Sequence, residues 1–106
     1  MDNLILFVQV QQKLNITWSD TVTNTRIEEI IKNAIPDLIH RLGITDKDFD
    51  FSVPGAENNL LLNYCLYEWN HCLNEFFDNY AESIAQIRTR NEVKQFLESE
   101  GNNAEI

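Results

Sequence analysis

The sequence predicts an all-α fold, a small helical bundle with one long central helix and a flexible carboxyl-terminal tail. Apolar residues recur at intervals of three and four over most of the chain, which is the spacing of a helix face. Three Gly and two Pro are too few for a turn-rich β-sandwich, and a 43% hydrophobic composition supports a folded core. Because 106 residues suffice for one core and not for two, we expect a single domain over residues 1–98 and a polar tail over residues 99–106.

The first stretch, residues 2–14, fits two kinds of structure. Its apolar residues have helical spacing, and Asp2 or Asn3 could cap the helix. Residues 8–11 alternate between Val and Gln, which would suit a strand. We predict a helix, followed by a turn over the polar residues 15–20.

The next helix has the most regular pattern, with apolar residues at Ile27, Ile30, Ile31, Ala34, Ile35, Leu38, Ile39 and Leu42. Thr25 and Glu28 match a capping box, although Asp20 or Thr23 could start the helix earlier. Glu28–Lys32 and Asp37–Arg41 are helical pairs of opposite charge.

Gly43 and Pro36 indicate how this helix ends and bends. Gly43 is placed to end it as a left-handed cap. Pro36 removes a helical hydrogen bond, so it should kink the axis or split the helix. We favour a kink, because the apolar periodicity continues in phase across Pro36.

Residues 45–56 predict a loop. Asp46, Asp48 and Asp50 alternate as in a calcium loop, but an EF-hand needs Gly at its sixth position, where this chain has Phe51. We therefore do not expect calcium binding, and expect Phe49 and Phe51 to pin the loop to the core.

Residues Asn58–Tyr80 contain no Gly or Pro and predict one helix about 35 Å long. Its predicted core residues are Leu61, Tyr64, Cys65, Trp69, Cys72, Phe76, Phe77 and Tyr80. An Asn stripe at residues 59, 63, 70 and 74 runs opposite and ends at Asp78. The apolar face is wider than one small domain would cover, so part of it could serve a subunit interface.

Residues 81–97 predict a further helical segment, either continuous with the preceding helix or broken near Asn79. The last residues, Ser99–Ile106, are polar with one Gly and two Asn. We expect them to be disordered in the isolated chain.

The reactive side chains do not form a recognisable catalytic or metal site. Cys65 and Cys72 would lie about 10 Å apart along one helix, too far for a disulfide, and are expected to be buried thiols. His71 and Cys72 are adjacent, so their side chains would be separated by about 100° around the helix axis and would not converge on one site. Because no nucleophile, phosphate-loop, dinucleotide or zinc motif occurs, we predict a non-enzyme without metal or cofactor.

The formal net charge is -9, from 17 acidic and 8 basic residues, which excludes a general nucleic-acid binder. The densest positive cluster is Arg88, Arg90 and Lys94, and it is interleaved with acids. No run of 18 apolar residues predicts a membrane span, and the first residues lack a signal-peptide pattern, so we expect synthesis into the cytoplasm and no membrane partner.

Four stretches carry a family likeness: KLNITWSD, TNTRIEEIIKNAIPDLIHRLGI, LLLNYCLYEWNHCLNEFFDNY and ESIAQIRTR. Their order resembles the head-tail connector, or adaptor, family of long-tailed bacteriophages and prophages, over roughly residues 10 to 90. Pro36 departs from that pattern. The resemblance implies an all-α structural protein of the virion neck that docks on the portal ring. It implies that copies assemble into a ring of typically about twelve and contact a further neck or tail-completion protein. DNA would then pass through the ring without specific binding.

The resemblance suggests interface roles for polar residues of the last two predicted helices. Asn70, Asn74 and Asp78 could face a neighbouring copy or the channel. Arg88, Arg90 and Lys94 could pair with acidic patches on a neighbour or on the portal, and Phe96 completes this candidate interface. The tail from Ser99 could become ordered on the portal.

Two other functions fit the composition. A DNA-mimicking inhibitor would need carboxylates arrayed on one face, whereas here they are mixed with Lys and Arg. A small helical module that binds a partner helix would need neither a portal nor a ring.

Overall fold

The structure is a computed structural model that describes residues 4–104, with their side chains as far as residue 100. It is all-α, as predicted, and the described residues contain no strand. Its helices are α1 (Leu4–Lys13), α2 (Thr21–Leu42), α3 (Ala56–Trp69), α4 (Leu73–Asn79) and α5 (Ala81–Ala104). The helix predicted near the amino terminus is thus confirmed as α1, while its predicted caps, Asp2 and Asn3, lie outside the described residues.

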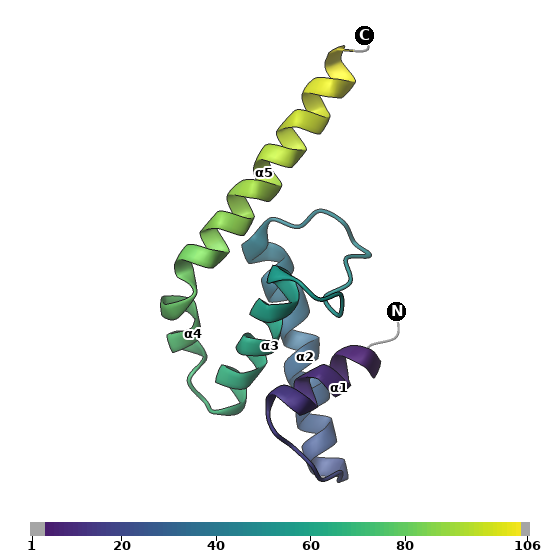
Figure 1. The fold of residues 1–106 in the computed structure, drawn as a ribbon, viewed down its shortest axis with the longest axis vertical. Coiled ribbons are helices and arrows are strands. Elements are labelled where there is room, and N and C mark those ends of the chain that lie inside the picture. Colours follow the sequence, from purple (N-terminus) through teal and green to yellow (C-terminus); the bar gives the residue numbers. More distant parts are fainter. Residues whose placement is uncertain (1–3, 105–106) are drawn as a thin grey trace.

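The body of the molecule is formed by α1, α2 and α3, with α1 crossing beside the amino-terminal half of α2 (Figure 1). The apolar stripe of α2 faces inward, because six of the eight predicted positions are buried and Ile35 and Ile39 are half-buried. Leu61 and Cys65 of α3 meet this stripe and are fully buried. Phe51 is 2% exposed and packs edge-on against Phe49, so the loop is pinned to the core as predicted.

The two ends of α2 show which sequence signals operate. The helix begins at Thr21, because the Asp20 carboxylate accepts a hydrogen bond of 2.8 Å from the Thr23 amide. Asp20 is therefore the cap, and the Thr25–Glu28 match falls inside the helix. The helix continues through Pro36 without a break, so the predicted alternative of two separate helices is wrong.

The single long helix predicted over residues 58–80 is wrong. The helix stops after Trp69, and α4 begins at Leu73 and turns back beside α3 (Figure 1). The turn places Phe76 against Tyr64, with ring centroids 5.5 Å apart. The wide apolar face is therefore covered by the chain's own α4, which removes the reason for assigning part of it to a subunit interface.

Three helices end with the same backbone motif. Asn15, Gly43 and His71 each have a positive φ of 58°, 65° and 60°, respectively, just after the ends of α1, α2 and α3. In each case the next residue's amide bonds to a carbonyl five residues back, such as Cys72 to Tyr67 at 2.9 Å. This is the Schellman pattern, in which a left-handed residue stops the helix. Asn and His tolerate that conformation better than most side chains do, so both stops formed without glycine.

The last helix, α5, makes the molecule elongated. The molecule extends over 57 × 30 × 19 Å. Its radius of gyration of 15.9 Å exceeds the value of about 13 Å that is expected for a compact chain of this length. Figure 1 shows α5 leaving the body beyond the carboxyl-terminal end of α2. Of the two predicted alternatives, the break near Asn79 is confirmed, since Tyr80 separates α4 from α5. The disorder predicted from Ser99 is wrong for residues 99–104, which continue α5.

Candidate interaction surfaces

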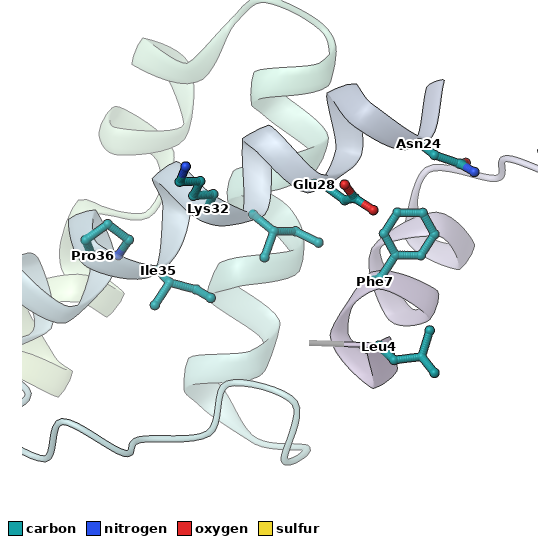
Figure 2. Close-up of a pocket in the computed structure, with 8 residues that line it drawn as sticks. Leu4, Phe7, Asn24, Glu28, Lys32, Ile35 and Pro36 are labelled. Carbon is teal, nitrogen blue, oxygen red and sulfur yellow. The ribbon is translucent and has the colours of Figure 1, made fainter. Parts of the chain in front are cut away.

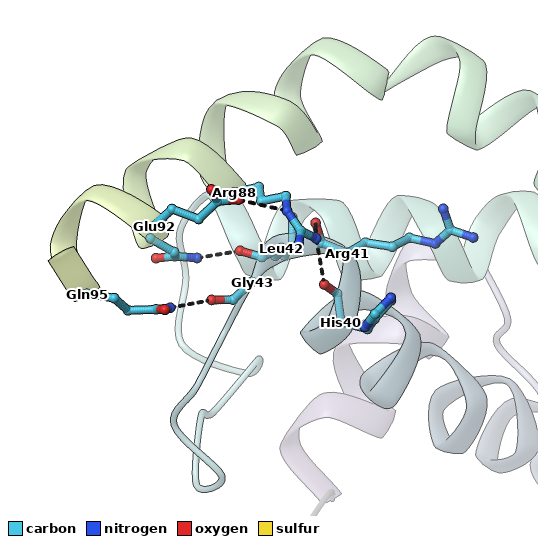
Figure 3. Close-up of polar contacts among 8 residues, drawn as sticks. His40, Arg41, Leu42, Gly43, Arg88, Glu92 and Gln95 are labelled. Carbon is cyan, nitrogen blue, oxygen red and sulfur yellow. Dashed lines mark hydrogen bonds and ion pairs between the residues drawn. The ribbon is translucent and has the colours of Figure 1, made fainter.

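The carboxyl-terminal end of α2 is held by side chains of α5, in a contact that we call the joint. Arg88 donates to the His40 carbonyl at 3.1 Å, and Gln95 donates to the Gly43 carbonyl at 2.9 Å (Figure 3). Between them, Asn91 donates to the Leu42 carbonyl at 2.7 Å. The last carbonyls of a helix lack partners within it, so the joint satisfies groups that would otherwise face water.

The cations that were predicted to bind a neighbour or the portal are mostly engaged within the chain. Arg88 also pairs with Glu92 at 2.9 Å, and Arg90 pairs with Glu57 of α3. Lys94 is exposed and forms no ion pair within the described part of the chain. Arg88 and Arg90 thus fix α5 to the body while their side chains stay 48% and 56% exposed, and Lys94 is the one of the three without an ion pair among the described residues.

The predicted polar stripe is divided by the break after α3. Asn63 is buried and donates to the Asn59 carbonyl at 2.8 Å, so it does not belong to an exposed face. Asn70, Asn74 and Asp78 are exposed, but they lie on different sides of the turn between α3 and α4. They consequently do not share the single helix face on which their proposed role depended.

The predicted core residues of the former long helix divide between buried and half-buried positions. Leu61, Tyr64, Cys65 and Phe76 are buried, and the others are half-buried, namely Trp69, Cys72, Phe77 and Tyr80. Arg26 of α2 lies over the Trp69 ring, 4.2 Å from its centroid, and donates to the Trp69 carbonyl at 2.7 Å. Trp69 therefore anchors the end of α3 to α2.

A series of side-chain contacts links α3 and α4 to α2. The Tyr64 hydroxyl donates to Asp37 at 2.9 Å, and Asp37 accepts from Arg41 at 2.7 Å. The Arg41 guanidinium lies 3.8 Å from the centroid of the Phe77 ring. Burial, followed by the bond to Asp37, raises the pKa of the Tyr64 hydroxyl. The raised pKa keeps the Tyr64 hydroxyl protonated as the donor to Asp37.

The thiols have the surroundings of structural residues. Burial, with a smaller effect of Glu68, raises the pKa of the Cys65 thiol to about 12, and partial burial raises that of Cys72. A raised pKa removes the thiolate that nucleophilic chemistry needs. Within residues 4–104, no cluster of three or more His, Cys, Asp or Glu residues could hold a metal ion. Over the same residues, no helix combines the length and the apolar character that crossing a membrane requires.

The outer side of α5 carries an exposed apolar stripe, the arm stripe, formed by Val93, Phe96 and Leu97. Their exposed fractions are 52%, 61% and 62%. The spacing of three and four places them together on one side, about 180° around the helix from Asn91 and Gln95 of the joint. Phe96 was predicted as an interface residue from the sequence, but Val93 and Leu97 were not, because their pattern looks the same as that of a core-facing helix.

A second apolar surface lies between α1 and α2, and we call it the α1–α2 groove. It has a volume of about 640 Å³ and is lined by Leu4, Phe7, Asn24, Glu28, Ile31, Lys32, Ile35 and Pro36 (Figure 2). Glu28 and Lys32, predicted to pair with each other, form no ion pair within the described residues. This groove could not be predicted from the sequence, because it depends on how α1 packs across α2.

No protein-family model, curated protein or solved structure matches this chain.

Proposed function

We propose that this protein is a head-tail connector, a structural component of the virion neck that docks on a portal ring and leaves a channel for DNA. One observation carries the proposal: a folded body bears a helix, α5, that projects from it and carries an exposed apolar stripe. A protein that joins two larger assemblies needs separate contact surfaces held at a fixed distance. The body and α5 provide that arrangement.

The charge of the chain supports a place beside passing DNA. A net charge of -9 repels phosphate, and two of the three clustered cations are neutralised within the chain. A channel wall must let DNA slide, which requires weak contact with its backbone. The same charge would oppose packing of copies at low salt, so ring formation would depend on apolar contacts or on the portal as a template.

Co-sedimentation with portal rings from the same genome tests the proposal. We expect binding at one copy per portal subunit, whether the free protein is monomeric or assembled. Duplex DNA, added as a competitor, should leave this binding unchanged. If the protein stays in the supernatant at portal concentrations well above those in an infected cell, the connector function is wrong.

A small helical interaction module is the second candidate, and the arm stripe favours it equally. Such a module would bind an apolar surface of a cytoplasmic partner and would ignore the portal. Failure to bind the portal, combined with a stable complex with a different partner that is lost in Phe96→Glu, would establish that function instead.

A further inference from the structure

We propose that the arm stripe of one copy docks in the α1–α2 groove of a second copy, so that copies join head to tail. The inference rests on the self-assembly part of the proposed function and names the two surfaces that make the contact. Binding of an apolar helix face in a groove between two helices is a recurring mode of recognition.

The arm stripe cannot be covered by its own body. The opposite side of α5 faces the body, where Arg88, Asn91 and Gln95 hold the last carbonyls of α2. Rotating α5 to bury Phe96 would break these bonds and return the Leu42 and Gly43 carbonyls to water. Three adjacent apolar side chains, each more than half exposed, therefore remain on the surface of the isolated chain.

The α1–α2 groove has the size and lining to accept this stripe. Its volume of about 640 Å³ is within the range of about 300–1,000 Å³ that is typical of ligand-sized pockets. Phe7 and Ile35 are half-buried and form apolar walls on opposite helices. An aromatic side chain such as that of Phe96 would bury most of its surface between them.

The polar groups around the two surfaces are complementary. Glu28 and Lys32 stand on the α2 wall of the groove without an ion pair among the described residues. On α5, Lys94, Glu98 and Glu100 lie beside or just after the stripe, and Glu92 is paired with Arg88, so the α5 surface also carries charges of both signs. The docked helix can therefore satisfy both charges of the groove.

One buried atom of the groove also lacks a partner. The side-chain oxygen of Asn24 is buried and accepts no hydrogen bond from the described residues. Asn24 lies at the end of the groove next to Phe7 (Figure 2). A buried acceptor without a partner is unfavourable, and a small shift of this amide would present it to a donor from an incoming helix.

The positions of the two surfaces make the contact intermolecular. The joint fixes α5 to residues 40–43 at the carboxyl-terminal end of α2, whereas the groove lies along residues 24–36. A chain therefore cannot fill its own groove. In the proposed contact the stripe of each copy occupies the groove of the next copy without reciprocal pairing, which makes the contact heterologous, and repeating it produces a ring if the rotation closes.

Sedimentation velocity over a concentration series, on the full chain and three variants, tests the contact. Phe96→Glu alters the stripe, Leu4→Glu alters the groove, and Val53→Glu is the control. Phe96, Leu4 and Val53 are 61%, 63% and 61% exposed, so all three variants add one negative charge at an equally exposed apolar position. We expect wild type and Val53→Glu to self-associate, more strongly as salt screens the charge of each copy.

Each of the other two variants should weaken self-association by at least about tenfold, since a carboxylate would enter an apolar contact. An equimolar mixture of Phe96→Glu and Leu4→Glu should form a one-to-one dimer and nothing larger. In that dimer, the intact stripe of the Leu4→Glu chain occupies the intact groove of the Phe96→Glu chain. A contact between two stripes or between two grooves would not give this result, and a reciprocal two-fold contact would stop the wild type at the dimer.

The proposal is overturned if the wild type stays monomeric at every concentration and salt, if the mixture does not dimerise, or if Val53→Glu weakens association as much as Phe96→Glu. Portal co-sedimentation separates this outcome from the connector function. A monomeric protein that binds portal rings would retain the function and lose the contact. Self-association without portal binding would retain the contact and lose the function.

Discussion

The body and α5 are held in place by different interactions. In the body, Ile27 and Leu38 of α2 and Leu61 of α3 have no exposed surface, and the two helices pack against each other. In residues 81–100 of α5, only Ile87 is buried, and the helix is fixed instead by polar side chains on the carbonyls of α2. The comparison shows how a small chain can hold an extended helix. Apolar burial stabilises the body, and hydrogen bonds set the direction of α5.

The largest expected difference in the free energy of unfolding is between substitutions of two Phe residues. Phe76→Ala removes a ring that is fully buried, and it should lower the free energy of unfolding by about 3–5 kcal/mol. Phe96→Ala removes a ring that is 61% exposed, and it should change that energy by less than about 0.5 kcal/mol. Urea unfolding followed by circular dichroism measures both. A similar loss in the two variants would mean that α5 is part of the same core.

The joint should contribute an intermediate amount. Asn91→Ala leaves the Leu42 carbonyl without its 2.7 Å hydrogen bond, and we expect a loss of about 1–2 kcal/mol. Gln86→Ala on the exposed side of the same helix is the control, with an expected change within about 0.5 kcal/mol. Hydrogen exchange of α5 amides gives a second measurement, in which Asn91→Ala should lower protection in α5 more than in α3. An equal loss of protection in α3 and α5 would contradict the view that α5 is held independently of the body.

The stop at His71 can be tested with a matched pair of substitutions. His71 has φ 60°, where a side chain costs about 1–2 kcal/mol relative to glycine. Both His71→Gly and His71→Ala remove the contact with Arg26, so their difference isolates the backbone. We expect His71→Gly to be more stable than His71→Ala by about 1 kcal/mol. If His71→Ala is the more stable variant, the left-handed stop is not what ends α3.

The smallest effect concerns pH. The Cys65 thiol ionises near its ordinary pKa of 9.0 when the chain is unfolded and near about 12 when it is folded. Above pH 9 the unfolded chain therefore binds fewer protons, so stability falls as pH rises and is unaffected below that range. Between pH 9 and pH 10 we expect a loss of up to about 1 kcal/mol, measured by urea unfolding. Cys65→Ala should be less stable at neutral pH but should lose less over this interval.

Of the helices of the body, α2 was the one predicted most fully from the sequence, because it depends on local spacing. The pattern from Ile27 to Leu42 identified α2 and its buried face, and Gly43 identified its end. The start at Asp20 was one of the alternatives, but the match of Thr25 and Glu28 to a capping box obscured it. Propensity and periodicity act within a few residues, so they report these features directly.

The turn between α3 and α4 could not be predicted in the same way. The apolar pattern continues in phase from Cys65 to Phe76, so periodicity alone extends the helix. Asn70 and His71 offered a weak signal, because both residue types tolerate the conformations that end a helix. What stabilises the turn is long-range packing, including Arg26 over Trp69, and sequence spacing does not report such contacts.

The candidate surfaces were predictable only in part. Lys94, Phe96, Arg88 and Arg90 are all exposed as an interface requires, but Arg88 also bonds to carbonyls of α2 and Arg90 pairs with Glu57. A cluster of cations in a sequence does not reveal which of them fold back on the chain. The groove was missed altogether, because it arises from the packing of α1 on α2.

The joint also determines how accurately the tip of α5 is placed. A helix of 24 residues that pivoted freely at its first residue would be a lever about 36 Å long, and a tilt of about 10° would move its end by about 6 Å. The bond from Gln95 to Gly43 shortens the free lever to the last nine residues, or about 14 Å. The same tilt then moves the end by only about 2 Å. The three side-chain contacts from Arg88, Asn91 and Gln95 thus reduce the displacement of the tip of α5 that a given tilt produces.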